Sequence, residues 1–180
     1  MFSILSLLPA AALSTGFEFG LGSGFIFYGD EKIRDMDDSL GDKNQIIFST
    51  DAAFMLPLNK TVMFTFGGDF NFDLHWHGGD HLNVIDYAFL MGVRAYPGLW
   101  GTFLSVDYAL GRRSDFISID NNEYVENTQW GNGFKISAGY DFSYHMKGFA
   151  PELVASFKSM PRGNSRDNIL GLSIKFTNHE

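Results

Sequence analysis

The clearest pattern in the chain is an alternation of apolar and polar side chains over residues 62–74, VMFTFGGDFNFDL. One face is apolar, and the other carries mostly small or polar side chains such as Thr65, Gly67, Asp69 and Asn71. A period of two predicts a β-strand. A soluble strand averages about five or six residues, whereas a tilted membrane-crossing strand needs about nine to eleven. This segment is long enough to cross a membrane. The apolar face consists of Val62, Phe64, Phe66, Phe70, Phe72 and Leu74.

The same alternation recurs along the chain and predicts eight strands in all. The segments between the first and second, third and fourth, fifth and sixth, and seventh and eighth predicted strands are long or polar, and the other connections are short turns. Alternating loop lengths are typical of an up-and-down antiparallel barrel that carries its large loops at one end. Both termini would then lie on the periplasmic side. The other predicted strands cover residues 16–28, 45–56, 84–95, 100–110, 129–144, 149–160 and 170–176.

The volume of the apolar side chains decides which face of such a barrel is outside. The chain has 19 Phe, most of them on the apolar faces. The interior of an eight-stranded barrel holds only modest side chains or one small ligand. We therefore predict an all-β, eight-stranded antiparallel up-and-down transmembrane β-barrel, with Phe64, Phe66, Phe70 and Phe72 facing lipid. Tyr and Trp near the strand ends favour the same orientation. A soluble lipocalin-like barrel with the opposite orientation is the outside alternative.

Bulk composition narrows the function classes. A length of 180 residues is typical of one domain, and a net charge of −8 argues against nucleic acid as a partner. The absence of Cys excludes disulfides, thiol catalysis and thiolate metal sites. No uninterrupted apolar run is long enough for a transmembrane helix.

The N-terminal run ILSLLPAAAL, residues 4–13, has the length of a signal-peptide core. Ala12, Leu13 and Ser14 resemble a cleavage site before Thr15. We predict that residues 1–15 are the remnant of a signal peptide and residues 16–180 form the barrel domain. The basic segment that usually precedes such a core is missing, so we expect the start of the leader to lie upstream.

Alternation places a large set of charged side chains inside the barrel. Unpaired buried charge is costly, so these groups should form ion pairs. We predict one layer of ion pairs toward the periplasmic end, one nearer the loops, and a lumen that they plug. Paired carboxylates could instead serve acid/base catalysis. The periplasmic layer holds Glu18, Arg94, Asp141, Glu152 and Lys175, and the other holds Asp69, Asp86, Asp107, Lys135 and Lys158; Asp51 and Asp73 are further inward acids.

Three histidines, His75, His77 and His81, are weak candidates for a zinc or copper site because no other ligands accompany them except Asp80. We expect a solvated, mobile loop there and no metal. An acidic segment, with Asp35, Asp37, Ser39 and Asp42, resembles part of a calcium loop but lacks its turn Gly and closing Glu.

Enzymatic chemistry has little support. Small barrel enzymes that modify lipid A need a Ser/His-type constellation, and Ser143 with His145 is the nearest candidate. No carboxylate has an obvious position to orient the His. We expect no enzymatic activity and no cofactor.

Two segments, GVRAYPGLWGTFLSVDYALGRRSDF and FEFGLGSGFIFYGD, resemble spirochaetal OmpW/OmpX-type barrels, and the whole pattern is similar to the small outer-membrane barrels OmpA (transmembrane domain), OmpX and OmpW. Resemblance to OmpX or OmpA implies a closed monomer in the bacterial outer membrane whose external loops contact host or envelope partners. Resemblance to OmpW implies uptake of small hydrophobic solutes, here past Leu90, Phe103 and Val154. The charged lumen favours the first function, a structural and surface-interaction role, and the second is the alternative.

Overall fold

The computed structural model describes residues 14–179 except 99, 120–121 and 146–147. The predicted leader, residues 1–15, lies outside the described residues apart from Ser14 and Thr15. Among the described residues, no helix combines the length and the apolar character that crossing a membrane would require.

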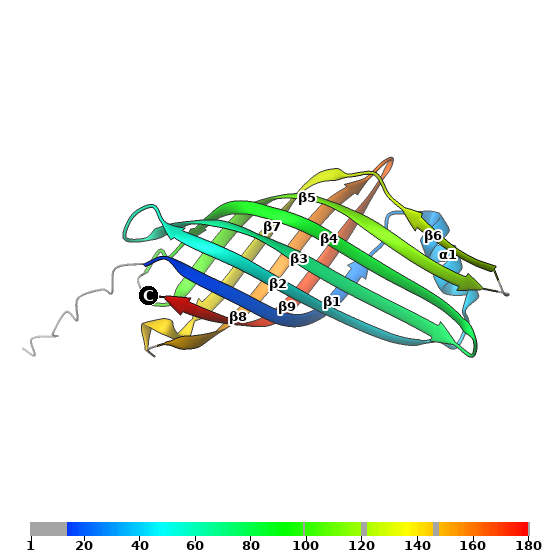
Figure 1. Cartoon of the computed structure of the whole chain (residues 1–180), viewed down its shortest axis with the longest axis horizontal. Helices are drawn as coiled ribbons and strands as arrows, with labels where there is room; N and C mark the ends of the chain where they lie inside the picture. The colour runs from blue at the N-terminus through cyan, green and yellow to red at the C-terminus, as the bar shows by residue number, and fades with distance from the viewer. Residues whose placement is uncertain (1–13, 99, 120–121, 146–147, 180) are drawn as a thin grey trace, which may run out of the picture.

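One antiparallel sheet closes on itself to form the barrel (Figure 1). Eight of its nine strands form the wall, because β1 pairs with β9 and β4 pairs with β5. The predicted eight-stranded up-and-down barrel is therefore confirmed. The ninth strand, β6, pairs with β5 outside the closed wall. The strands are β1 Gly16–Phe27, β2 Asn44–Pro57, β3 Val62–His77, β4 Asp80–Ala95, β5 Thr102–Ile119, β6 Asn122–Asn127, β7 Gly131–Asp141, β8 Phe149–Arg162 and β9 Ser165–His179.

The two ends of the barrel differ. The start of β1 and the end of β9 lie at one end, here called the lower end, and helix α1 (Glu31–Ser39) and β6 lie at the other, the upper end (Figure 1). A short 3-10 helix, η1 (Phe142–Tyr144), follows β7 at the lower end.

The wall is apolar outside and polar inside. On β3, Phe66 and Phe70 are 53% and 46% exposed, whereas Asp69 and Asp73 are buried. Phe64 and Phe72 share the outward face and are half-buried between neighbouring strands. A soluble lipocalin-like barrel would have the opposite arrangement, with its apolar face inward.

Strands β3, β4, β5, β8 and β9 are longer at the upper end than the sequence pattern predicted. The predicted loops at residues 75–83 and 161–167 are wrong, because β3 continues into β4 and β8 into β9 through tight turns in which Gly78 and Gly163 have φ of 59° and 70°. The predicted loop at residues 111–128 is wrong as well, because β5 runs to Ile119 and pairs with β6. Beyond Leu110 the outward apolar series is interrupted by Arg112 and Ser114 before it returns at Phe116, so the continuous apolar face ends before the strand does.

Helix α1 replaces the irregular loop predicted at residues 30–44. The side chain of Asp30 caps the helix by accepting a hydrogen bond from the backbone N–H of Lys32 at 3.0 Å. Ile33 is buried against inward-facing side chains of the extended β4 and β5, so the helix covers the upper mouth of the barrel. We call this packing the cap cluster, which comprises Ile33, Leu40, Leu82, Val84 and Ile117.

Candidate functional site in the barrel lumen

The charged side chains inside the barrel form three connected layers. The lower layer comprises Glu18, Asp51, Arg94, Glu152 and Lys175. Arg94 donates to Glu18 at 2.7 Å and to Glu152 at 3.2 Å, while Lys175 donates to Glu18 at 3.0 Å and also contacts Asp51. The guanidinium of Arg94 also lies 4.1 Å from the ring centroid of Phe103, a cation–π contact.

The middle layer comprises Asp69, Asp86, Lys135, Lys158 and Arg162. Lys158 Nζ donates to Asp69 at 2.7 Å and to Asp86 at 2.6 Å, so one ammonium joins two carboxylates. Lys135 donates to Asp69 at 3.0 Å, and Arg162 donates to Asp86. Lys135 Nζ also lies 4.0 Å from Asp51 Oδ2, which connects this layer to the lower one.

The upper layer lies beneath the cap and was not predicted. It comprises Asp30, Arg113, Asp115 and Asp167. Arg113 donates to Asp115 at 2.8 Å, to Asp167 at 2.7 Å and to Asp30 at 3.2 Å. The guanidinium holds the start of α1 to β5 and β9.

Two predicted members of the ionic layers have other partners. Asp141 accepts a hydrogen bond from the hydroxyl of Tyr96 at 3.2 Å and, at η1, from the backbone N–H of Ser143 at 2.8 Å. Asp107 accepts from the hydroxyl of Thr65 at 2.7 Å. Asp141 thus links β7 to Tyr96 and to the backbone of η1, and it is the cross-strand partner of Glu152 in the lower layer.

An apolar cluster fills the lumen below the lower layer. It comprises Met55, Met63, Tyr96, Phe103 and Val154, and all five are buried. The apolar lining that an uptake route would use is divided, since Leu90 packs in a separate cluster with Ala88, Ala109 and Met160.

The histidines do not converge on one point. His75 Nδ1 lies 2.6 Å from Asp37 of α1 and its Nε2 lies 2.7 Å from Asp73. His77 Nδ1 instead contacts the backbone oxygen of Asp42 at 2.6 Å. In the part of the chain that the structure describes, no three His, Asp or Glu side chains are grouped so that they could hold a metal ion. The mobile loop predicted around His81 is wrong, because these residues continue strands β3 and β4.

The remaining weak candidates also take structural positions. Asp35, Asp37 and Ser39 lie on α1, so the backbone does not form the calcium-type loop, and Asp37 pairs with Lys43. His145 Nε2 lies 2.9 Å from the hydroxyl of Tyr140. Ser143 is in η1 beyond the end of β7, so the predicted strand over residues 129–144 is too long at this end.

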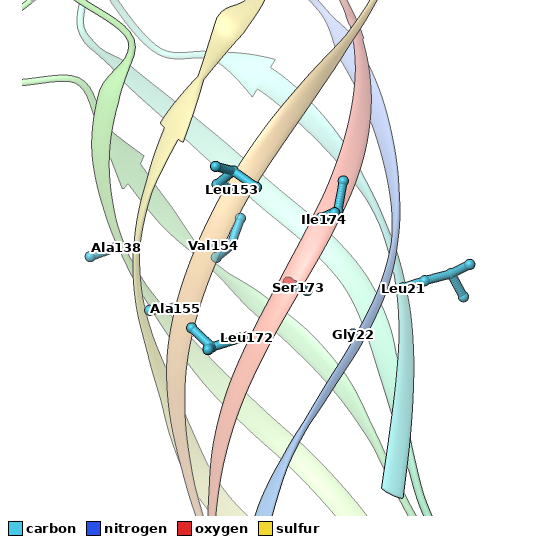
Figure 2. A pocket seen from close by; sticks show the side chains of 9 residues that line it. All are labelled: Leu21, Gly22, Ala138, Leu153, Val154, Ala155, Leu172, Ser173 and Ile174. Atoms are coloured by element: carbon cyan, nitrogen blue, oxygen red, sulfur yellow. The ribbon is translucent and has the colours of Figure 1, made fainter.

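Space within the charged part of the lumen is small. Two cavities of about 20 Å³ each lie among the lower and middle layers, beside Asp51 and Lys135. A cavity of this size holds about one water molecule. A larger hollow, of about 560 Å³, lies over β1, β7, β8 and β9, where Leu21, Leu153 and Leu172 are exposed on the outside of the wall (Figure 2). It therefore belongs to the apolar exterior of the barrel.

The charges Arg113, Asp115 and Asp167 were missed because their strands were predicted to be too short at the upper end. Arg113 and Asp115 continue the inward alternation of β5, and Asp167 continues that of β9. The signal was the alternation itself, which persists on the inward face of β5 after Arg112 interrupts the outward apolar series.

Comparisons with known proteins show the fold. No protein-family model matches the sequence, and no curated protein matches it. Among solved structures, the chain is similar to Ail, the attachment invasion locus protein of Yersinia pestis, with a TM-score of 0.60 and 10% identity over 92% of this chain and 99% of that one. It is also similar to Neisserial surface protein A (NspA), with a TM-score of 0.54 and 9% identity over 89% of this chain and 95% of that one. At these identities the similarity concerns the barrel fold alone.

Proposed function

We propose that this chain is an integral barrel of the bacterial outer membrane that is sealed by its lumen charges. Its upper extension, by which we mean helix α1 and strand β6, contacts host or envelope partners. The observation that carries the proposal is the combination of an apolar exterior with a charged, nearly filled interior. Exposed Phe side chains belong against lipid, because soluble proteins rarely leave large apolar patches exposed. The similarity to Ail and NspA, barrels described as an attachment protein and a surface protein, supports it.

The lumen favours a sealed barrel over a transport route. A solute entering from the upper end would meet the cap cluster and then three ionic layers before the lower apolar cluster. Opening the middle layer would separate Lys158 from two carboxylates at 2.6–2.7 Å, and breaking buried ion pairs is strongly unfavourable. We therefore favour the surface-interaction role over OmpW-like uptake.

Side-chain contacts connect the upper extension internally and to the wall. Helix α1 forms an ion pair with β6 between Lys32 and Glu126, and it meets β3 where Asp37 lies 2.6 Å from His75. Tyr124 and Val125 of β6 are exposed, 41% and 53% respectively. An exposed aromatic and aliphatic pair on an edge strand is suited to contact with another protein.

Planar-bilayer conductance, with an open sixteen-stranded porin as the positive control, tests the sealed lumen. We expect the purified barrel to insert and to give no discrete conductance steps. Steps comparable to those of a small pore would contradict the plug and favour uptake.

Detergent dependence tests the membrane assignment separately. We expect the folded chain to require detergent or lipid to remain monodisperse. A monodisperse protein in detergent-free buffer would favour the soluble barrel.

Protease treatment of intact cells tests the orientation of the barrel. With periplasmic termini, the protease should cleave the upper extension and leave both termini intact.

A further inference from the structure

An arginine points outward from the wall where the continuous apolar series of β5 is interrupted. Four successive outward side chains of β5 are exposed and apolar or aromatic, Arg112 is the next outward residue, and an exposed apolar side chain returns only at Phe116. The four are Leu104, Val106, Tyr108 and Leu110. In a barrel embedded in lipid, we expect a charged outward side chain at the end of such a series to lie near the depth at which hydrocarbon meets headgroups. The following argument therefore rests on the proposed membrane location.

Aromatic rings surround Arg112. Tyr87 of β4 is its cross-strand partner, and the guanidinium lies 6.0 Å from the ring centroid of Trp130. Tyr87 meets Trp130 edge-on at 5.9 Å, and Phe89 stacks on Trp130 at 6.3 Å. Trp and Tyr are favoured at membrane interfaces, so this group marks the boundary independently of the apolar band.

Within the described part of the chain, no acidic side chain forms an ion pair with Arg112 and no acceptor reaches its guanidinium. Its Nε is buried without a hydrogen-bond partner. This distinguishes it from Arg94, Arg113 and Arg162, which each bind carboxylates inside the barrel. A guanidinium is a planar, bidentate donor that matches the oxygens of a phosphate.

We infer that Arg112, Tyr87 and Trp130 form a binding site for the phosphate of an anionic membrane lipid, with the acyl chains lying along the apolar side chains below. The net charge of −8 would repel anionic lipid in general, so any preference for such a lipid has to arise locally. Arg112 supplies the charge, and the rings of Tyr87 and Trp130 border the headgroup.

Fluorescence quenching of Trp130 tests this site directly. Replacing Trp76 and Trp100 by Phe leaves Trp130 as the single reporter, because the chain has 3 Trp. The barrel is reconstituted in phosphatidylcholine vesicles that contain phosphatidylglycerol with brominated acyl chains, and quenching is compared with that from brominated phosphatidylcholine. One basic residue near a membrane surface contributes about 1 kcal/mol, so we expect a preference of about 5-fold for phosphatidylglycerol.

Two variants separate the local site from net charge. Arg112→Gln should abolish the preference, whereas Arg166→Gln, which removes the same charge from an outward position on β9, should retain it. Arg112→Lys should keep part of the preference, since an ammonium retains charge but loses the bidentate geometry.

The outcomes are distinct. A barrel that inserts but shows equal quenching by both lipids overturns the site while leaving the proposed function intact, and so does an equal loss in Arg112→Gln and Arg166→Gln. Failure to insert at all would overturn both. If added inorganic phosphate removed the preference completely, the site would bind free anions rather than lipid, which would also refute the lipid assignment.

Discussion

Arg94 offers the sharpest test of the plugged lumen. Its guanidinium is within 4.0 Å of two carboxylates, and in the described residues it is the one ion-pair partner of Glu152, which is completely buried. Replacing Arg94 by Met keeps an unbranched side chain but leaves Glu152 without a cation. Glu18 would keep Lys175 at 3.0 Å.

The expected cost follows from those contacts. Removing one partner of a buried ion pair destabilises a protein by about 3–5 kcal/mol, and the cation–π contact with Phe103 adds about 0.5–2 kcal/mol. The pairing between Lys175 and Glu18 limits the loss, so we expect Arg94→Met to lower the free energy of unfolding by about 4 kcal/mol. Adding Glu152→Gln should recover at least about 2 kcal/mol, because the uncompensated charge is removed.

Urea unfolding of the barrel in lipid vesicles, followed by Trp fluorescence, measures these differences. Lys135→Met is the matched control. Its side chain is 11% exposed and its partner Asp69 keeps Lys158, so we expect a loss of only about 1.5 kcal/mol. An Arg94→Met barrel within about 1 kcal/mol of the parent, or a double variant no more stable than Arg94→Met, would refute the account of the lower layer as a network of compensated charges.

Three further predictions concern other parts of the molecule. Gly139→Val should lower the free energy of unfolding by about 1–3 kcal/mol, because a Cβ at this position would lie 2.6 Å from a backbone oxygen of β8. As the control, Gly79→Ala should leave the urea midpoint unchanged, because the space around Gly79 is open. Burial and Asp73 raise the pKa of Tyr28 well above its usual value. The stability that Tyr28 gives the cap should therefore be complete below about pH 10 and fall as the pH rises above it. Amide exchange in α1 should become faster at alkaline pH in the parent protein, and Tyr28→Phe should remove this pH dependence. Ile33→Ala should lower the free energy for opening the cap by about 2–5 kcal/mol and increase amide exchange in residues 31–39. An equal increase of amide exchange in the barrel strands would contradict a cap that opens separately.

The architecture could be predicted because a barrel wall imposes one rule on every strand. Outward side chains meet an apolar environment and inward side chains a polar one. Phe66 and Asp69 are three residues apart and so lie on opposite faces of the strand, which already indicates which face points outward. Strand length could not be obtained from the apolar face. On β5 the continuous apolar series stops at Leu110, while the strand continues for nine more residues, to Ile119, because pairing with β4 and β6 satisfies its backbone.

The lower and middle charge layers were predictable in most of their members but not in their pairing, whereas the upper layer and Arg162 were missed. Alternation places Lys158 and Asp86 on inward faces, yet their contact joins β8 to β4 across the lumen, and a period of two carries no information about which strands face each other. Helix α1 was missed for a different reason. Its apolar residues, among them Ile33 and Met36, are few in a strongly acidic segment, and its stability comes from packing on strands distant in sequence.

The contact between Lys175 and Glu18 has a consequence for how the chain reaches its final state. These residues are 157 positions apart and belong to the first and last strands, so they meet only when the seam between β1 and β9 forms. A partly assembled intermediate would expose uncompensated charge to hydrocarbon, which is strongly disfavoured. Assembly should therefore be cooperative and slow, since its decisive contacts are distant along the polypeptide.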